Sequence, residues 1–192
     1  MAPTLVREAF AFQEVGFELG YTATSDSGFG SGFVYGGSVI EGTGRLGLAL
    51  SLLGFNNTIS YSHLVKTGGP DSVFSYEEKF SDFCLGIFGA WMLERADKKT
   101  RLVAALGPEV HFLKATKLYV VQRFSETARE SRLGAGAMVR YERRLEMFGR
   151  TTLLVSASFS WMESGIRRTD IYTPPPEGMT SGALTVGLAF HF

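Results

Sequence analysis

The sequence predicts an all-β protein, an eight-stranded antiparallel up-and-down transmembrane β-barrel with short periplasmic turns and four long extracellular loops. Three observations predict it: the apolar segments are about 9–12 residues long, bulky and small side chains alternate within them, and charges are almost absent from them. No segment reaches the roughly 20 apolar residues that a membrane-spanning helix needs. We expect one domain over residues 1–192, with residues 1–9 as a loose N-terminal segment.

Composition excludes several classes of protein. The 19 Lys and Arg residues balance 19 Asp and Glu residues, whereas nucleic-acid-binding proteins normally carry a basic excess, so no nucleic-acid partner is expected. The single cysteine, Cys84, excludes an internal disulfide and a multi-cysteine metal centre. The three histidines show no ligand spacing either, so the sequence predicts no metal site and no cofactor.

Eight segments show the period-two alternation of half-buried strands. In the first, bulky residues at positions 15, 17, 19 and 21 alternate with small or polar ones. The third segment is short, and Pro108 removes a hydrogen-bond donor from the fifth, which predicts a bulge there. In chain order the segments span residues 15–22, 45–52, 59–62, 83–93, 102–112, 133–141, 153–161 and 183–192.

The connections between these segments alternate in length. Short turns are expected around Asn56-Asn57, 95–100 and 144–149, where turn-forming or charged residues gather. Long loops are expected over residues 25–41, 66–79, 114–131 and 163–180. Short turns at one end and long loops at the other are typical of outer-membrane barrels, and an even number of strands places both termini on the short-turn side.

The charge distribution indicates which face of each strand meets lipid. A soluble lipocalin-like barrel would show the same alternation with its bulky side chains inside, but its outer wall would normally carry charges. No charge occurs over residues 46–65 or 151–162, so we expect the bulky side chains to face lipid and the small ones to fill a narrow lumen. Two aromatic girdles are predicted, Trp91 and Tyr141 near the short turns and Tyr21, Tyr61 and Trp161 near the long loops.

The last segment, SGALTVGLAFHF, ends in Phe192 and has apolar residues at every second position: Leu184, Val186, Leu188 and Phe190. It resembles the C-terminal β-signal that the barrel-assembly machinery reads, and the whole chain resembles the small outer-membrane barrels of the OmpX/OmpA-barrel type. The resemblance implies a location in the bacterial outer membrane, contact with its lipid and lipopolysaccharide, and a secretion signal that is absent from this chain because it has been removed.

Polar residues with lumen-facing parity form the first candidate site. Because buried charges must be paired, they predict a salt-bridged plug that fills the lumen; a gate whose ion pairs switch is the alternative. This predicted lumen network comprises Glu18, Arg45, Glu109, His111, Arg140 and His191.

The third predicted loop is the second candidate site, because it is rich in basic residues. Such a loop beside the bilayer is suited to contact lipopolysaccharide phosphates or an acidic extracellular or envelope protein partner. These residues are Lys114, Lys117, Arg123, Arg129 and Arg132.

The sequence therefore predicts a barrel that acts structurally or through its loops, in envelope integrity, adhesion or partner binding. Alternatives are a passive channel for small or hydrophobic molecules, a lipid A acyltransferase or deacylase, and a soluble carrier. Enzymes of that kind need a serine and a histidine within reach of each other. Ser62 and His63 are adjacent in a strand and so point to opposite faces, and no catalytic residue is assigned.

Overall fold

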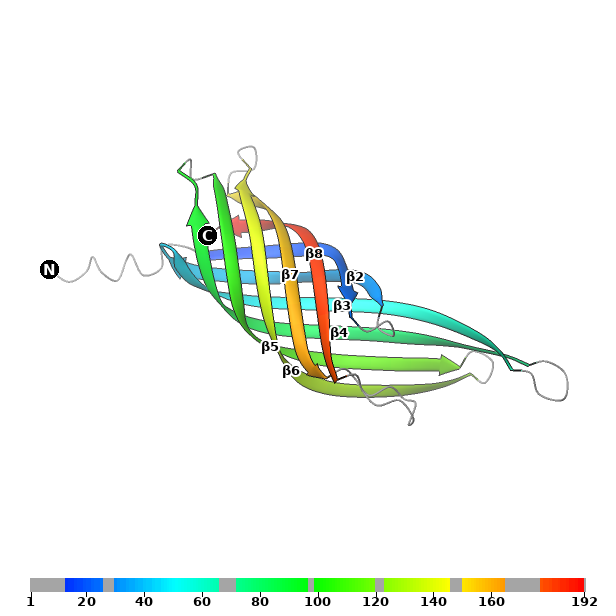
Figure 1. Ribbon diagram of the computed structural model, residues 1–192. Helices are drawn as coiled ribbons and strands as arrows, with labels where there is room; N and C mark the ends of the chain where they lie inside the picture. Colours follow the sequence, from blue (N-terminus) through cyan, green and yellow to red (C-terminus); the bar gives the residue numbers. More distant parts are fainter. Residues whose placement is uncertain are drawn as a thin grey trace.

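A computed structural model describes residues 13–25, 30–65, 72–96, 99–119, 123–145, 150–164 and 177–191. Eight strands follow one another around a closed barrel, each antiparallel to its neighbours, and β1 closes the ring against β8 (Figure 1). This confirms the predicted fold class. Among the described residues, no helix is long and apolar enough to cross a membrane. The strands are β1 (Gln13–Thr24), β2 (Ser31–Thr43), β3 (Leu46–Val65), β4 (Ser72–Glu94), β5 (Thr100–Tyr119), β6 (Phe124–Arg144), β7 (Thr151–Ser164) and β8 (Glu177–His191).

Strand assignment near the N-terminus differs from the prediction, although the number of strands agrees. The segment predicted as the first long loop contains β2, and Asn56-Asn57 lies inside β3 instead of forming a turn. The glycines and serines of β2 have loop-like composition, but the segment pairs with β1 on one side and β3 on the other. Its turn to β3 is at Gly44, whose φ of 61° suits glycine.

The predicted bulge at Pro108 is also absent. Gly86 pairs with Glu109 and Gly89 pairs with Leu106, so the register is the same on both sides of the proline. The ladder between β4 and β5 is interrupted there without an extra residue. Proline breaks the pairing because it has no N–H to donate.

The four central strands are longer than the four that flank them. Strands β3 to β6 contain 20, 23, 20 and 21 residues, against 12, 13, 14 and 15 in β1, β2, β7 and β8. Much of the predicted third loop is therefore strand, and its turn contains Arg123 with a φ of 52°. The long strands extend beyond the closed ring at the end opposite the termini, here called the loop end (Figure 1). The end at which β1 begins and β8 finishes is called the terminal end.

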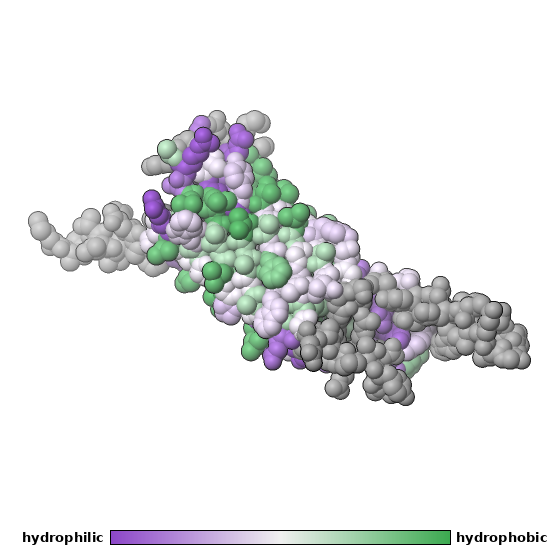
Figure 2. Space-filling view, in the orientation of Figure 1, coloured by the Kyte–Doolittle hydropathy of each residue, from purple (hydrophilic) through white to green (hydrophobic). Residues whose placement is uncertain are grey.

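The outer wall of the barrel is apolar, as predicted. Bulky side chains such as Leu48, Phe17 and Leu184 point outward and are 62–69% exposed, and Figure 2 shows hydrophobic residues across the middle of the molecule. A surface of this size without charges requires lipid around it. The arrangement is the reverse of a lipocalin-like barrel, so the soluble-carrier alternative is wrong.

Small and medium-sized side chains fill the interior. One apolar cluster, near the terminal end, contains Phe88, Met92 and Met138 together with Ile40, Ala49, Ala90, Val103 and Ala105. A second, near the loop end, consists of Phe55, Phe80, Leu113, Met162 and Met179. Polar residues occupy the lumen between and beside these clusters.

Candidate functional site

Arg140 of β6 is the centre of the lumen network, and its side chain is 1% exposed. Its Nη2 forms an ion pair with Glu18 of β1 and donates to Ser38 Oγ of β2 at 2.8 Å. Its Nε donates to Ser156 Oγ of β7 at 3.1 Å. These partners lie on β1, β2 and β7, so the guanidinium reaches from β6 across the lumen.

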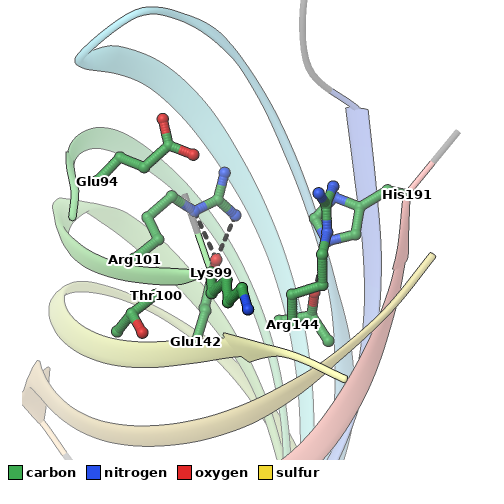
Figure 3. Close-up of a pocket in the computed structure, with 8 residues that line it drawn as sticks. Glu94, Lys99, Thr100, Arg101, Glu142, Arg144 and His191 are labelled. Carbon is green, nitrogen blue, oxygen red and sulfur yellow. Dashed lines mark hydrogen bonds and ion pairs between the residues drawn. The ribbon is translucent and has the colours of Figure 1, made fainter. Parts of the chain in front are cut away.

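A second ionic group lies below Arg140, towards the terminal end. Arg101 of β5 donates through Nε to Glu142 Oε2 and through Nη2 to Glu14 Oε2, each at 2.5 Å. His191 Nε2 is 2.6 Å from Thr152 Oγ1 and 3.8 Å from Glu14 Oε2. Arg101, Glu142 and His191 line a cavity at this mouth of the barrel (Figure 3). The volume of this cavity is about 50 Å³.

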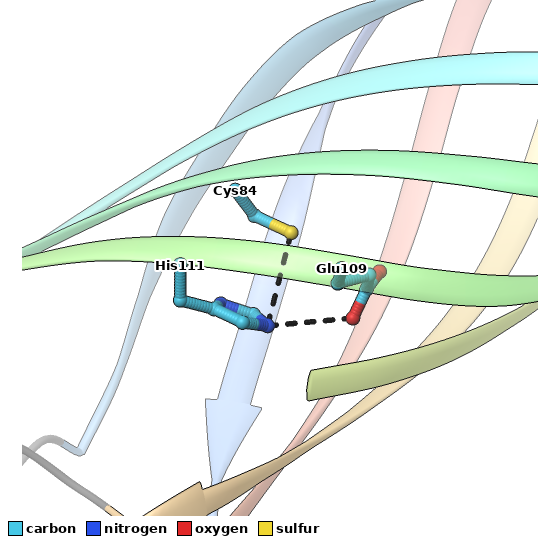
Figure 4. Close-up of side chains that lie close together, drawn as sticks. All are labelled: Cys84, Glu109 and His111. Carbon is cyan, nitrogen blue, oxygen red and sulfur yellow. Dashed lines mark hydrogen bonds and ion pairs between the residues drawn. The ribbon is translucent and has the colours of Figure 1, made fainter. Parts of the chain in front are cut away.

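A third polar group lies between Arg140 and the loop end. His111 Nδ1 is 2.8 Å from Asp82 Oδ2, and its Nε2 is 3.4 Å from Glu109 Oε2 and 3.8 Å from Cys84 Sγ (Figure 4). Asp82, Cys84 and His111 line a second cavity, of about 40 Å³, which shares no lining residue with the first. Arg140 lies between the two cavities along β6.

Sequence reasoning placed one residue of this network wrongly and missed four. Arg45 is exposed in the turn between β2 and β3, because β3 begins at Leu46, one residue later than the predicted segment 45–52. The missed residues are Glu14, Asp82, Arg101 and Glu142. All four lie one residue beyond a predicted segment and have lumen-facing parity, so extending the alternation by one residue would have found them.

The predicted basic loop residues are distributed over both faces of the extended strands. Lys114 of β5 and Arg129 of β6 are exposed on the outer face and lie opposite each other. Lys117 points inward and is 6% exposed, so it is placed wrongly as a lipid contact. Arg132 is half-buried and forms an ion pair with Glu130, and Arg123 is exposed in the turn after β5.

Four of the predicted girdle residues are exposed on the outer wall: Tyr21, Trp91, Tyr141 and Trp161. Trp91 and Tyr141 lie near the terminal end, whereas Tyr21 and Trp161 lie near the loop end of the short strands. The alternating apolar residues of the predicted assembly signal from Leu184 to Phe190 also face outward. The side chain of Tyr61, and Phe192, lie outside the described residues.

His111 is an interior histidine, but its contacts do not form the pair that acyl transfer needs. His111 lies against Asp82, Glu109 and Cys84, and in the described structure Ser156 accepts from Arg140 instead. Nucleophilic catalysis requires the hydroxyl and the imidazole to be hydrogen-bonded to each other. This geometry does not support a serine–histidine pair at His111. The side chains of Ser62 and His63 lie outside the described residues.

No family model matches the chain, and no curated protein matches its sequence. Solved structures match its fold. Neisserial surface protein A aligns with a TM-score of 0.60 at 13% identity, over 94% of this chain and 97% of that one. A major outer membrane protein from Thermus thermophilus aligns with a TM-score of 0.60 at 14% identity, over 94% and 99% of the two chains. Ail, the attachment invasion locus protein of Yersinia pestis, in complex with the heparin analogue sucrose octasulfate, aligns with a TM-score of 0.54 at 12% identity, over 94% and 99%.

These similarities lie at the level of the fold. The fold and the continuous apolar outer wall together define an integral β-barrel of the bacterial outer membrane, as the sequence predicted.

Proposed function

We propose that this protein is a closed structural barrel that binds lipopolysaccharide phosphates through Lys114 and Arg129. The observation that carries the proposal is the position of these two cations: side by side on the outer face, directly beyond the apolar wall. The barrel would thereby strengthen the packing of the outer leaflet and hold its extended β3–β6 sheet at the cell surface.

The height of the cations supports this role. Phe83, Phe112 and Leu133 are outward-facing residues of β4, β5 and β6 at the edge of the apolar wall. Lys114 is two residues beyond Phe112 on β5, and Arg129 of β6 lies directly opposite Lys114, four residues beyond Leu133. Each strand rises about 3.3 Å per residue. The two charges therefore stand about 7 Å beyond Phe112 along the strands, a position that suits contact with lipid headgroups.

The electrostatics of the pair favour an anionic ligand. Like charges directly opposite each other on a sheet repel, and in the described residues neither Lys114 nor Arg129 forms an ion pair with a carboxylate. A phosphate between them would remove the repulsion and accept charge-assisted hydrogen bonds from both. Nearby Lys79 differs, because Glu77 lies 3.8 Å from it. The Ail structure holds a polyanion, so a sulfated sugar is a useful competitor in testing this chain.

The double variant Lys114→Gln/Arg129→Gln is expected to bind lipid A at least tenfold more weakly than the wild type. Two charge-assisted hydrogen bonds are lost, each contributing about 1.5–3 kcal/mol. The measurement is titration of detergent-refolded protein with bis-phosphorylated lipid A, with bound lipid counted by native mass spectrometry.

The matched control is Arg95→Gln/Arg143→Gln, which removes two exposed cations at the terminal end. It should bind as the wild type does, and sucrose octasulfate should compete only where Lys114 and Arg129 are present. Equal loss in both double variants, or equal binding of dephosphorylated lipid A by the wild type, would contradict the proposal.

The filled lumen predicts an absence of steady ion conduction. Arg140 extends across the lumen to partners on β1, β2 and β7, and the two cavities described above share no lining residue, which supports a blocked lumen. In planar bilayers the wild-type protein should therefore show no stable channels, even in about 1 M salt, where charge screening extends only about 3 Å. Stable unitary steps would favour the passive-channel alternative.

A further inference from the structure

The polar group near the loop end of the lumen has the dimensions of a metal site. Cys84, Glu109 and His111 each offer one ligand atom, and these atoms lie within 4.8 Å of one another (Figure 4). His111 Nε2 is 3.4 Å from Glu109 Oε2 and 3.8 Å from Cys84 Sγ. Zinc bound at about 2.3 Å from sulfur and about 2.0–2.2 Å from nitrogen and oxygen holds tetrahedral ligand atoms about 3.3–3.6 Å apart. We propose that these three side chains bind Zn²⁺.

The carboxylate of Glu109 is buried and incompletely hydrogen-bonded. The residue is 4% exposed, and among the described residues its Oε2 accepts no hydrogen bond, although it lies 3.4 Å from His111 Nε2. A buried carboxylate oxygen without a hydrogen bond is costly, and a divalent cation between it, the imidazole and the thiolate would compensate it.

Asp82 prepares His111 for this role. Its Oδ2 lies 2.8 Å from His111 Nδ1, so the ring can donate its Nδ1–H to the carboxylate. In the neutral imidazole this leaves the lone pair of Nε2 directed towards Cys84 and Glu109, where a metal ion would accept it. A histidine that binds a metal usually has this second contact, which fixes its tautomer and orientation. We assign Asp82 as a positioning residue and the other three as ligands.

Two glycines of β6 make room for the ligands. A Cβ at Gly136 would overlap the carboxylate of Glu109, and one at Gly134 would come within 3.1 Å of His111 Nε2. Glycine at both positions of the neighbouring strand β6 therefore leaves room for the side chains of Glu109 and His111.

The cavity beside the cluster supplies access and a fourth ligand. It is lined by Cys84 and His111 and reaches Thr24 and Ser181, which lie near the loop ends of β1 and β8. Three protein ligands leave a tetrahedral ion one position for water. The mixed sulfur, nitrogen and oxygen donors select zinc over Mg²⁺ and Ca²⁺, which take oxygen ligands.

Cobalt is the probe for the site, because thiolate-bound Co²⁺ gives a charge-transfer absorption that Zn²⁺ quenches on exchange. Wild-type protein refolded in detergent under reducing conditions should bind one Co²⁺ with this absorption and lose it when Zn²⁺ is added. His111→Gln and Glu109→Gln keep the thiol but should weaken binding at least tenfold, and Asp82→Asn should weaken it by a factor of about 10–100.

His191→Gln is the matched control, because it removes a histidine at the other end of the lumen and should leave cobalt binding unchanged. Migration of unboiled samples on gels shows which variants are folded. If a ligand variant does not fold, X-ray absorption of the zinc-loaded wild type decides: one sulfur with nitrogen and oxygen neighbours supports the site. No charge-transfer band in the wild type, an all-oxygen zinc shell, or unchanged affinity in folded His111→Gln and Glu109→Gln overturns the proposal.

Discussion

Replacement of Arg140 by methionine is expected to destabilise the barrel by about 3–5 kcal/mol. The substitution preserves most of the side-chain volume. Among the described residues it leaves the buried carboxylate of Glu18 with Thr185 Oγ1, at 2.5 Å, as its one remaining hydrogen-bond partner. It also removes the hydrogen bonds to Ser38 and Ser156 that join β6 to β2 and β7. Unfolding in urea from phospholipid bilayers, followed by tryptophan fluorescence, measures the change.

The double variant Glu18→Gln/Arg140→Met separates the unpaired charge from the loss of packing. Most of the lost stability should return in it, because a neutral amide is far cheaper to bury than an unpaired carboxylate. Arg143→Met, an exposed position on the same strand, should change stability by less than about 0.5 kcal/mol. A cost at Arg140 no larger than that at Arg143 would show that the ion pair does not hold the ring together.

Alanine at Gly187 is expected to destabilise the barrel by about 3 kcal/mol, because overpacking against the backbone cannot be relieved by a rotamer change. A Cβ there would overlap the carbonyl oxygen of Phe17 and come within 2.8 Å of Glu18 Cγ. Both neighbours belong to β1, so the clash falls on the seam where β1 and β8 close the barrel. The urea midpoint and the fraction of heat-modifiable, folded protein should both fall.

Gly182→Ala on the same strand is the matched control. The nearest atom to a Cβ at this position is Ser158 O at 3.9 Å, which is ordinary contact. The free energy of unfolding of Gly182→Ala should stay within about 1 kcal/mol of the wild-type value. Alanine lowers the conformational entropy of the unfolded chain, which acts in favour of the folded barrel. Equal effects of the two substitutions would mean that close approach at the seam is not what requires glycine at position 187.

The alternation of the wall strands was sufficient to predict how the barrel faces lipid. Leu184, Val186 and Leu188 share one face of β8 and are exposed, whereas Thr185 between them is buried. The assignment of residues to the outer or inner face does not depend on where a strand begins or ends, because neighbouring residues of a strand point to opposite faces. Arg45 shows its limit: a shift of one residue at a turn moved a predicted lumen charge to the surface.

The sequence predicted that polar residues line the lumen, but it did not predict which of them form ion pairs with each other. Glu18 and Arg140 are far apart in sequence and meet because β1 and β6 lie across the lumen from each other. The zinc ligands come from β4 and β5, so their spacing along the chain resembles no metal motif. Register brings Cys84 opposite His111, and register is a property of the sheet.

By itself, therefore, the sequence determined the class of fold and the lipid-facing side, because these depend on local side-chain periodicity. The predicted count of eight strands agrees only because β2 was missed and β3 was predicted as two segments. Only the tertiary structure decided that residues 31–43 form a strand, that β3 to β6 extend beyond the ring, and that Cys84, Glu109 and His111 converge. Those features depend on which strands pair and where they begin to pair. Hydrogen bonds between strands can stabilise a glycine-rich or polar segment whose own composition favours a loop.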